Sequence, residues 1–139
     1  MIQQKLPGIM TIGYVRGARL QRQMMHKSLA GLPVAIMTDI TPINFVGIPT
    51  CEATSDYDNG GRIEKTTLKF ATNDKLQLFK DMAFVVKDTN GNAYVIGARE
   101  KPHPIIKKSI STGVPNGDPA LTSYEVTLYA HRSLIPCSI

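Results

Sequence analysis

The stretch from residue 84 to residue 97, FVVKDTNGNAYVIG, constrains the fold more than any other part of the chain. Its central Asn90-Gly91 pair predicts a β-hairpin, because a two-residue type I′ turn needs positive φ at both central positions. With these two residues as the loop, Val85 lies opposite Ile96 on the neighbouring strand. Both faces of the predicted hairpin are then apolar near its base, whereas an ordinary surface hairpin has one polar face.

Something is expected to cover the second face of this hairpin. Burial of one Val or Ile side chain is worth roughly 1.5–3 kcal/mol, so Val85 and Ile96 would be costly to leave in water. Two coverings fit the sequence. Residues 76–79, which include leucine and phenylalanine, fold back over that face, or a neighbouring subunit packs on it.

Two longer segments also show the period of two that is typical of half-buried strands. Residues 62–72 alternate throughout, with Leu68 and Phe70 on the apolar face. Residues 122–134 alternate as well, with Tyr124 on the apolar face and Glu125 on the polar one. These two segments are predicted to be strands with one face toward the core.

The remaining segments are shorter or irregular. Helical spacing of Leu20 and Met24 favours a short helix within residues 17–31. We expect strands at 9–15 and 33–37, a loop or irregular edge at 41–50, an exposed turn at 54–62, a short helix or extended link at 73–82 and a loop at 113–121. The whole pattern predicts a mainly β protein, an antiparallel β-sandwich or barrel with one or two short helices and long arms or loops.

The basic charge of the chain is concentrated near its N-terminus. The chain of 139 residues has a formal net charge of +5, and residues 1–38 contain five basic residues and no acid. We therefore expect a single β domain over residues 1–139, with residues 1–32 as a basic N-terminal arm or extension. Such an arm suits an acidic protein surface or nucleic acid. Docking to protein is favoured because the charges are spread singly and no nucleic-acid-binding motif is present.

The sequence predicts no cofactor and no metal or catalytic site. Its three histidines are scattered, and its two cysteines are in no CxxC pair, so two free thiols in a reducing compartment are expected. The run SDYDN at residues 55–59 starts like a calcium loop but lacks the glutamate that the EF-hand pattern requires, and we interpret it as a solvated turn. No apolar run reaches the length of a membrane span, and no signal-peptide pattern is present.

Residues 62–135 resemble small structural proteins of tailed bacteriophages and prophages, of the head–tail connector, tail-completion or tail class. The resemblance is carried by TLKFAT, LQLF, MAFVVKDTNGNAYVIGAREKPHPII, GVPNGDP and SYEVTLYAHRSLIP, in that order. It covers about half of the chain. It implies a subunit of a virion ring or tube, made in the host cytoplasm, that works by packing rather than by catalysis.

From these observations we expect a non-enzymatic virion protein that forms a homo-oligomeric ring and contacts other virion proteins. Residues 1–32 and 54–62 would engage neighbouring subunits, since phage rings use such arms for strand addition. The candidate interface residues are Arg16, Arg19, Arg22, Val85 and Ile96. The alternative is a nucleic-acid-binding β-barrel that contacts DNA through its basic N-terminal segment.

Overall fold

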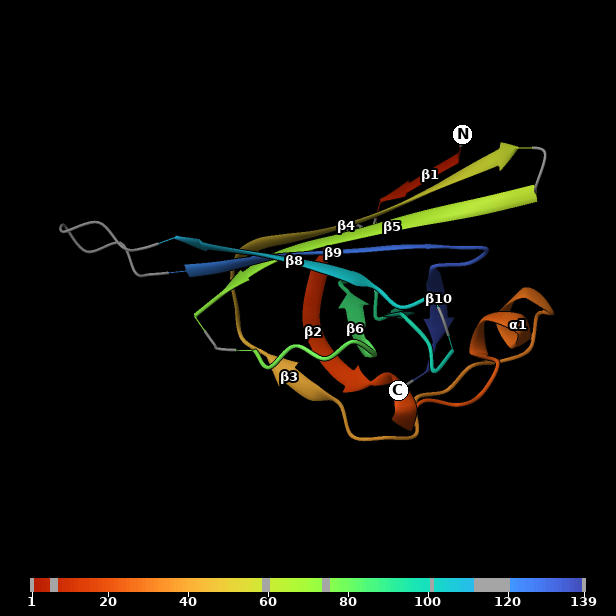
Figure 1. Ribbon diagram of the computed structural model, residues 1–139, viewed down its shortest axis with the longest axis horizontal. Coiled ribbons are helices and arrows are strands. Elements are labelled where there is room, and N and C mark those ends of the chain that lie inside the picture. Colours follow the sequence, from red (N-terminus) through yellow and green to blue (C-terminus); the bar gives the residue numbers. More distant parts are fainter. Residues whose placement is uncertain are drawn as a thin grey trace.

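The computed structural model describes residues 2–5, 8–58, 61–73, 76–100, 102–111 and 121–138, and these form two packed antiparallel sheets (Figure 1). In spatial order, sheet A consists of β1 (Ile2–Lys5), β4 (Phe45–Asp58), β5 (Gly61–Thr72), β9 (Leu121–Ala130) and β8 (Ile105–Ser111). Sheet B consists of β10 (Leu134–Cys137), β7 (Ala93–Ile96), β6 (Met82–Asp88), β2 (Ile9–Arg16) and β3 (Thr41–Ile43). The predicted mainly β, antiparallel sandwich is confirmed.

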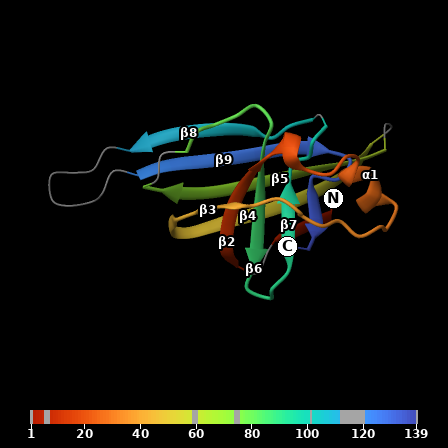
Figure 2. The ribbon, with the colours of Figure 1, turned by 90° about the horizontal axis from the view of Figure 1, so that it is seen from below.

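The strands of sheet B cross those of sheet A at a steep angle. Figure 2 shows the long strands of sheet A running across the view, with β2, β6 and β7 crossing in front of them. The strands of sheet A extend beyond the area that sheet B covers. The two ends of sheet A are therefore placed to present residues outside the common core.

The first core lies between the two sheets. The predicted alternation of β5 is confirmed, because Leu68 and Phe70 are buried while Lys69 between them is exposed. The ring of Phe70 stacks on Tyr124 of β9 with 5.3 Å between centroids, and it contacts Phe84 of β6 at 6.1 Å. These three rings join the middle strands of both sheets.

The β6–β7 hairpin is present, but its turn differs from the predicted one. The N–H of Gly91 donates to the carbonyl of Asp88 at 3.2 Å, and Gly91 has a φ of 86° while Asn90 does not have positive φ. These features indicate a three-residue loop made of a type I turn and a glycine bulge. The type I′ prediction is wrong because the side chain of Asp88 offers the loop another set of hydrogen bonds.

The side chain of Asp88 stabilises the three-residue loop through hydrogen bonds to its backbone. Its Oδ1 atom accepts hydrogen bonds from the N–H groups of Asn90 at 3.0 Å and Asn92 at 2.9 Å. The longer loop shifts the strand register by one residue, so Val85 pairs with Val95 and Phe84 with Ile96. Val85 and Ile96 consequently lie on opposite faces, contrary to the prediction.

The outer face of the hairpin is covered by the N-terminal part of the same chain. Val85 belongs to a second core with Leu20, Met24, Val34 and Ile36. Figure 2 shows the segment between α1 (Met24–Leu29) and β3 passing across the front of sheet B. For Val85 both predicted coverings are therefore wrong, because residues from the N-terminal part of the same chain bury it.

Residues 76–79 pack elsewhere. Leu76 and Phe79 contact the core between the sheets, and residues 76–81 form an extended link rather than a helix. Ile96 also belongs to that core, where its side chain is fully buried.

Most of the predicted N-terminal arm is part of the sandwich. The predicted strand at 9–15 is confirmed as β2, which pairs with both β6 and β3 and buries Ile12 and Val15. A 3-10 helix, η1 (Gly17–Arg19), and α1 follow it, so the helix predicted within 17–31 is present but short. The description of residues 1–32 as an arm is thus wrong for residues 9–29, because their apolar side chains complete the two cores.

Residues 33–37 do not form the predicted buried strand. Only Ala35 makes an isolated parallel bridge, to Ser138, although Val34 and Ile36 are buried as expected. The N–H of Ile36 donates to the Ser138 carbonyl at 2.8 Å, and the N–H of Ser138 donates to the Val34 carbonyl at 2.9 Å. This segment is an extended cover strip held to the end of β10.

The remaining predictions concern connections between strands. The turn predicted over 54–62 is mostly strand, because β4 continues to Asp58 and β5 starts at Gly61. The irregular edge at 41–50 is confirmed as β3 followed by a break in the β4–β5 register between Val46 and Thr50. The segment 122–134 contains β9, and then a turn leads into β10. Most of the predicted loop at 113–121 lies outside the described residues.

Candidate interaction surface

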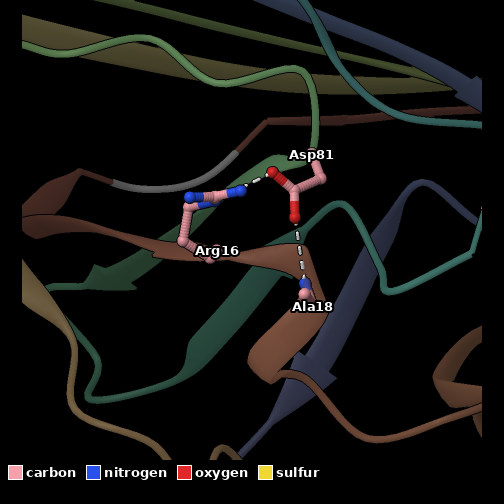
Figure 3. A network of polar contacts seen from close by, with 3 residues as sticks. All are labelled: Arg16, Ala18 and Asp81. Atoms are coloured by element: carbon pink, nitrogen blue, oxygen red, sulfur yellow. Dashed lines mark hydrogen bonds and ion pairs between the residues drawn. The ribbon is translucent and has the colours of Figure 1, made fainter.

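Arg16, the first predicted interface residue, is bound to its own chain at the end of β2. Its Nε atom donates to Oδ1 of Asp81 at 2.9 Å, and the N–H of Ala18 donates to Oδ2 at 3.1 Å (Figure 3). The guanidinium also lies over the ring of Phe79, with 4.0 Å to the centroid. Asp81 is thereby held by two partners from the start of η1.

Gly17 allows this close approach between the two segments. Its N–H donates to the carbonyl of Asp81 at 2.6 Å. A Cβ atom at this position would lie 2.6 Å from that oxygen and 2.8 Å from the carbonyl oxygen of Ala98. Any other residue would therefore force the backbone segments apart.

The pKa of Asp81 reflects these contacts. Desolvation by itself would raise the pKa of this carboxyl group, but the hydrogen bonds from Ala18 and Arg16 and the charge of Arg16 outweigh it. The net effect is a pKa below the usual value of an aspartate. Arg16 and Asp81 form a charged pair that fastens η1 to the start of β6.

Arg19 and Arg22, the other predicted interface arginines, are exposed. The N–H of Gln23 donates to Oε1 of Glu100, and Gly17 lies against Ala98, so residues 17–23 run beside residues 97–100. Arg99, which is exposed, therefore lies in a segment close to the one that carries Arg19 and Arg22. We call the three exposed side chains, Arg19, Arg22 and Arg99, the arginine patch.

The two carboxylates nearest to the patch are already bound to other groups. Asp81 accepts from Arg16 and Ala18, and Glu100 accepts from the backbone of Gln23. The sequence alone identified Arg19 and Arg22, but it gave no sign of Arg99, which lies in the connection between β7 and β8. Only the pairing of segments far apart in the chain brings it there.

Val85 and Ile96 do not belong to this surface. Their side chains are 3% and 0% exposed and pack on opposite faces of sheet B inside the chain. Their assignment as interface residues is therefore corrected. Ile96 faces the core between the sheets because of the one-residue register shift of the hairpin. Val85 is buried because residues 20–36 cover it.

A small cavity lies beside the arginine patch. It is about 50 Å³ in volume and is lined by the start of α1, the β7–β8 connection and the ends of β9 and β10. Its apolar lining includes Met25, Leu128, Ala130 and Ile135, and its polar lining includes His26, Glu100 and Arg132. Arg132 is fixed by a hydrogen bond from Nη1 to the Ser28 carbonyl of α1 at 3.2 Å.

A separate buried polar cluster surrounds Glu64 on β5. Its Oε1 atom accepts from the N–H groups of Ser133 at 2.9 Å and Leu134 at 2.8 Å. The hydroxyl of Ser133 is also 2.5 Å from that of Thr66. This cluster holds the turn between β9 and β10 against sheet A. Its side chains all have partners from within the chain, and its role is structural.

The two cysteines are free thiols in different sheets. Burial, with a smaller contribution from the charge of Glu52, raises the pKa of Cys51 to about 12. Burial likewise raises the pKa of Cys137 to about 11. Both thiols are therefore protonated at neutral pH and are poor nucleophiles and metal ligands.

Among the described residues, no group of three or more His, Cys, Asp or Glu side chains is arranged to hold a metal ion. Within the same part of the chain, none of the helices is both long enough and apolar enough to cross a membrane. Comparisons with protein-family models, with curated proteins and with solved structures found no match to this chain.

Proposed function

We propose that this chain is a non-enzymatic structural subunit of a tailed-phage virion, in a ring or tube at the head–tail junction or in the tail. The proposal starts from the resemblance of residues 62–135 to small phage structural proteins. The chain would function by assembling with copies of itself and with other virion proteins.

The observation that carries the proposal is the open edge of sheet A at β8. This strand pairs with β9 on one side, and the sheet order gives it no strand on the other side within the described residues. It exposes 59% of Ile105 and 66% of Ile110. An exposed edge strand with large apolar side chains is a template for strand addition by another chain.

The long β4–β5 hairpin gives further support. These strands have 14 and 12 residues, whereas about 5–6 residues are typical of strands in globular proteins. Their paired ends extend past the rest of the sandwich (Figure 1). A hairpin of this length is suited to reach a neighbouring subunit in a ring.

Light scattering of the purified protein, together with electron micrographs of phage particles, tests the proposal. We expect a closed oligomer, or incorporation into particles if the subunit is monomeric before assembly. Replacing Ile105 and Ile110 together by glutamate should abolish assembly, because the added charges oppose strand addition. Leu78→Glu together with Met37→Glu, at two other exposed apolar residues, is the matched control. A wild-type protein that is strictly monomeric and absent from particles would refute the proposal.

A second candidate function is binding of nucleic acid, and the arginine patch is the observation that favours it. Exposed arginines bind phosphate groups, and the affinity then falls steeply with salt. Deleting residues 1–32 is unsuitable as a test because β2 is an inner strand of sheet B. Arg19→Glu with Arg22→Glu changes two exposed side chains and should abolish salt-sensitive binding to a DNA duplex. Absence of wild-type binding at low salt would eliminate this function.

A further inference from the structure

The small cavity and the arginine patch belong to the same two segments of the chain. Gln23 and Glu100 both line the cavity, and their sequence neighbours Arg22 and Arg99 belong to the patch. The hydrogen bond between Gln23 N–H and Glu100 joins the two segments at this place. An apolar hollow therefore opens next to exposed positive charge.

The size of the hollow limits what can enter it. A cavity of roughly 150 Å³ holds a molecule the size of benzene. At about 50 Å³, this cavity is too small for an aromatic ring or a nucleobase. Its apolar lining from Leu128, Ala130 and Ile135 suits the end of one aliphatic side chain.

The charges around the cavity determine which sign of charge a binding partner should carry. Arg19, Arg22 and Arg99 are exposed, and the charge of Asp81 is compensated by its ion pair with Arg16. Glu100 accepts a backbone N–H and keeps its negative charge, so the arginines outnumber the acids here. Arg132, on the cavity wall, contributes another positive charge that is fixed through Ser28. The surface is thus complementary to carboxylates, for which the planar guanidinium is a good partner.

We propose that the cavity and the arginine patch, which we together call the cleft, bind an acidic peptide segment of a partner protein. One aliphatic side chain of the segment enters the cavity. The inference rests on the proposed function, since it gives the chemistry of the contact between this subunit and a neighbour in the virion. The aliphatic side chain acts as the anchor, and flanking carboxylates pair with the arginines. Burial of an apolar anchor provides affinity, while the charged surroundings favour encounter and orientation.

The same observations favour a peptide over nucleic acid. A phosphate backbone would use the arginines but would leave the apolar cavity empty. A base cannot fill the cavity because of its size. Only a partner that carries both an aliphatic group and negative charge uses both parts of the feature.

Fluorescence anisotropy with labelled synthetic peptides tests the proposal on the full chain. The probe is a peptide of aspartate and glutamate residues with one central leucine. A second peptide carries glycine in place of the leucine, and a third carries lysines in place of the acids. A single-stranded oligonucleotide is the fourth probe. We expect the acidic leucine peptide to bind at low salt and at least about tenfold more tightly than the other two peptides.

Variants of the protein separate the two parts of the cleft. Arg22→Glu with Arg99→Glu should weaken binding of the leucine peptide by about tenfold or more, because two favourable charge contacts become repulsive. Ala130→Leu should remove the preference for leucine over glycine by filling the cavity. Lys107→Glu with Lys108→Glu, an equal charge change at two exposed residues of β8, is the control and should leave binding unchanged. Circular dichroism and thermal unfolding confirm that each variant is folded.

Three results would overturn the proposal. One is no binding of the leucine peptide to the wild-type protein. Another is equal binding of the leucine and glycine peptides, which would mean that the patch binds polyanions without using the cavity. The last is tighter binding of the oligonucleotide that disappears in the same arginine variants. A protein that binds the peptide but neither oligomerises nor enters particles would refute the virion role while leaving the cleft intact.

Discussion

Glu64 on β5 accepts a hydrogen bond from the backbone N–H of Leu134 at 2.8 Å, across 70 positions of the chain. The same carboxylate oxygen accepts from the N–H of Ser133. Through these contacts a single side chain of sheet A holds the first residue of β10 in sheet B.

Glu64→Ala should destabilise the protein strongly. The N–H groups of Ser133 and Leu134 would lose their acceptor inside the protein, at a cost of about 1–3 kcal/mol each in the free energy of unfolding. Glu64→Gln keeps one acceptor oxygen and should have a smaller effect. Urea denaturation measures both variants against Glu125→Ala, which removes a carboxylate from the polar face of β9. A loss no larger than that of the control would contradict the structural role of Glu64.

Asp81→Asn should lower the stability at neutral pH but not in strong acid. The pKa of Asp81 in the folded state lies below the unfolded value of about 3.9, so the unfolded chain binds more protons in this range. The stabilisation is therefore complete above the unfolded pKa and is lost as the pH falls through the folded pKa. Unfolding measured over a series of pH values should show this acid dependence reduced in Asp81→Asn and kept in Asp39→Asn, a change at an exposed carboxylate.

Met24→Ala should cost about 2–5 kcal/mol in the free energy of unfolding, since large-to-small changes in a core leave a cavity. Met24 is fully buried in the second core, between α1 and sheet B. Met37→Ala, at a side chain that is 83% exposed, should change the stability by less than about 0.5 kcal/mol. Equal and small effects of the two changes would show that residues 20–36 do not cover sheet B.

The β6–β7 turn gives a test of the strand register. Gly91→Ala should destabilise the protein by about 1 kcal/mol or more, because its φ of 86° is unfavourable for other residues. Asn90→Ala should have a much smaller effect, since Asn90 does not have positive φ in the three-residue loop. A type I′ turn would instead make both changes costly. Thermal unfolding of the two variants distinguishes the two loops.

The sequence predicted the strands that alternate but not all of their partners. The period of two in residues 62–72 correctly placed Leu68 and Phe70 inside, because this period directly reflects which face meets the core. It also placed Glu64 on that face, without indicating why a carboxylate would be buried there. The explanation is a pair of N–H groups contributed by Ser133 and Leu134, which no local pattern reveals.

The candidate surface was predictable only in part, because contacts between distant segments also determine which of its residues are exposed. The charge distribution predicts Arg16, Arg19 and Arg22 alike as interface residues, but Arg16 is bound by Asp81 and Phe79 of its own chain. The face on which Ile96 lies depended on one residue of register, which the side chain of Asp88 decides by binding the loop. The helical spacing of Leu20 and Met24 predicts only a short helix. Nothing in the sequence indicated that residues 20–36 cover sheet B, because most of this segment is neither a regular strand nor a helix.

The bridge between Ala35 and Ser138 has a consequence for how the protein is made. The cover strip over sheet B is fastened by residues that are synthesised about a hundred positions after it. While the ribosome is still producing β9 and β10, the apolar residues Val34 and Ile36 lack their final attachment. Pairing between such distant segments is intrinsically slow to form. We expect the cover strip to be attached only after β10 has been synthesised, so chaperones can bind its apolar residues during this interval.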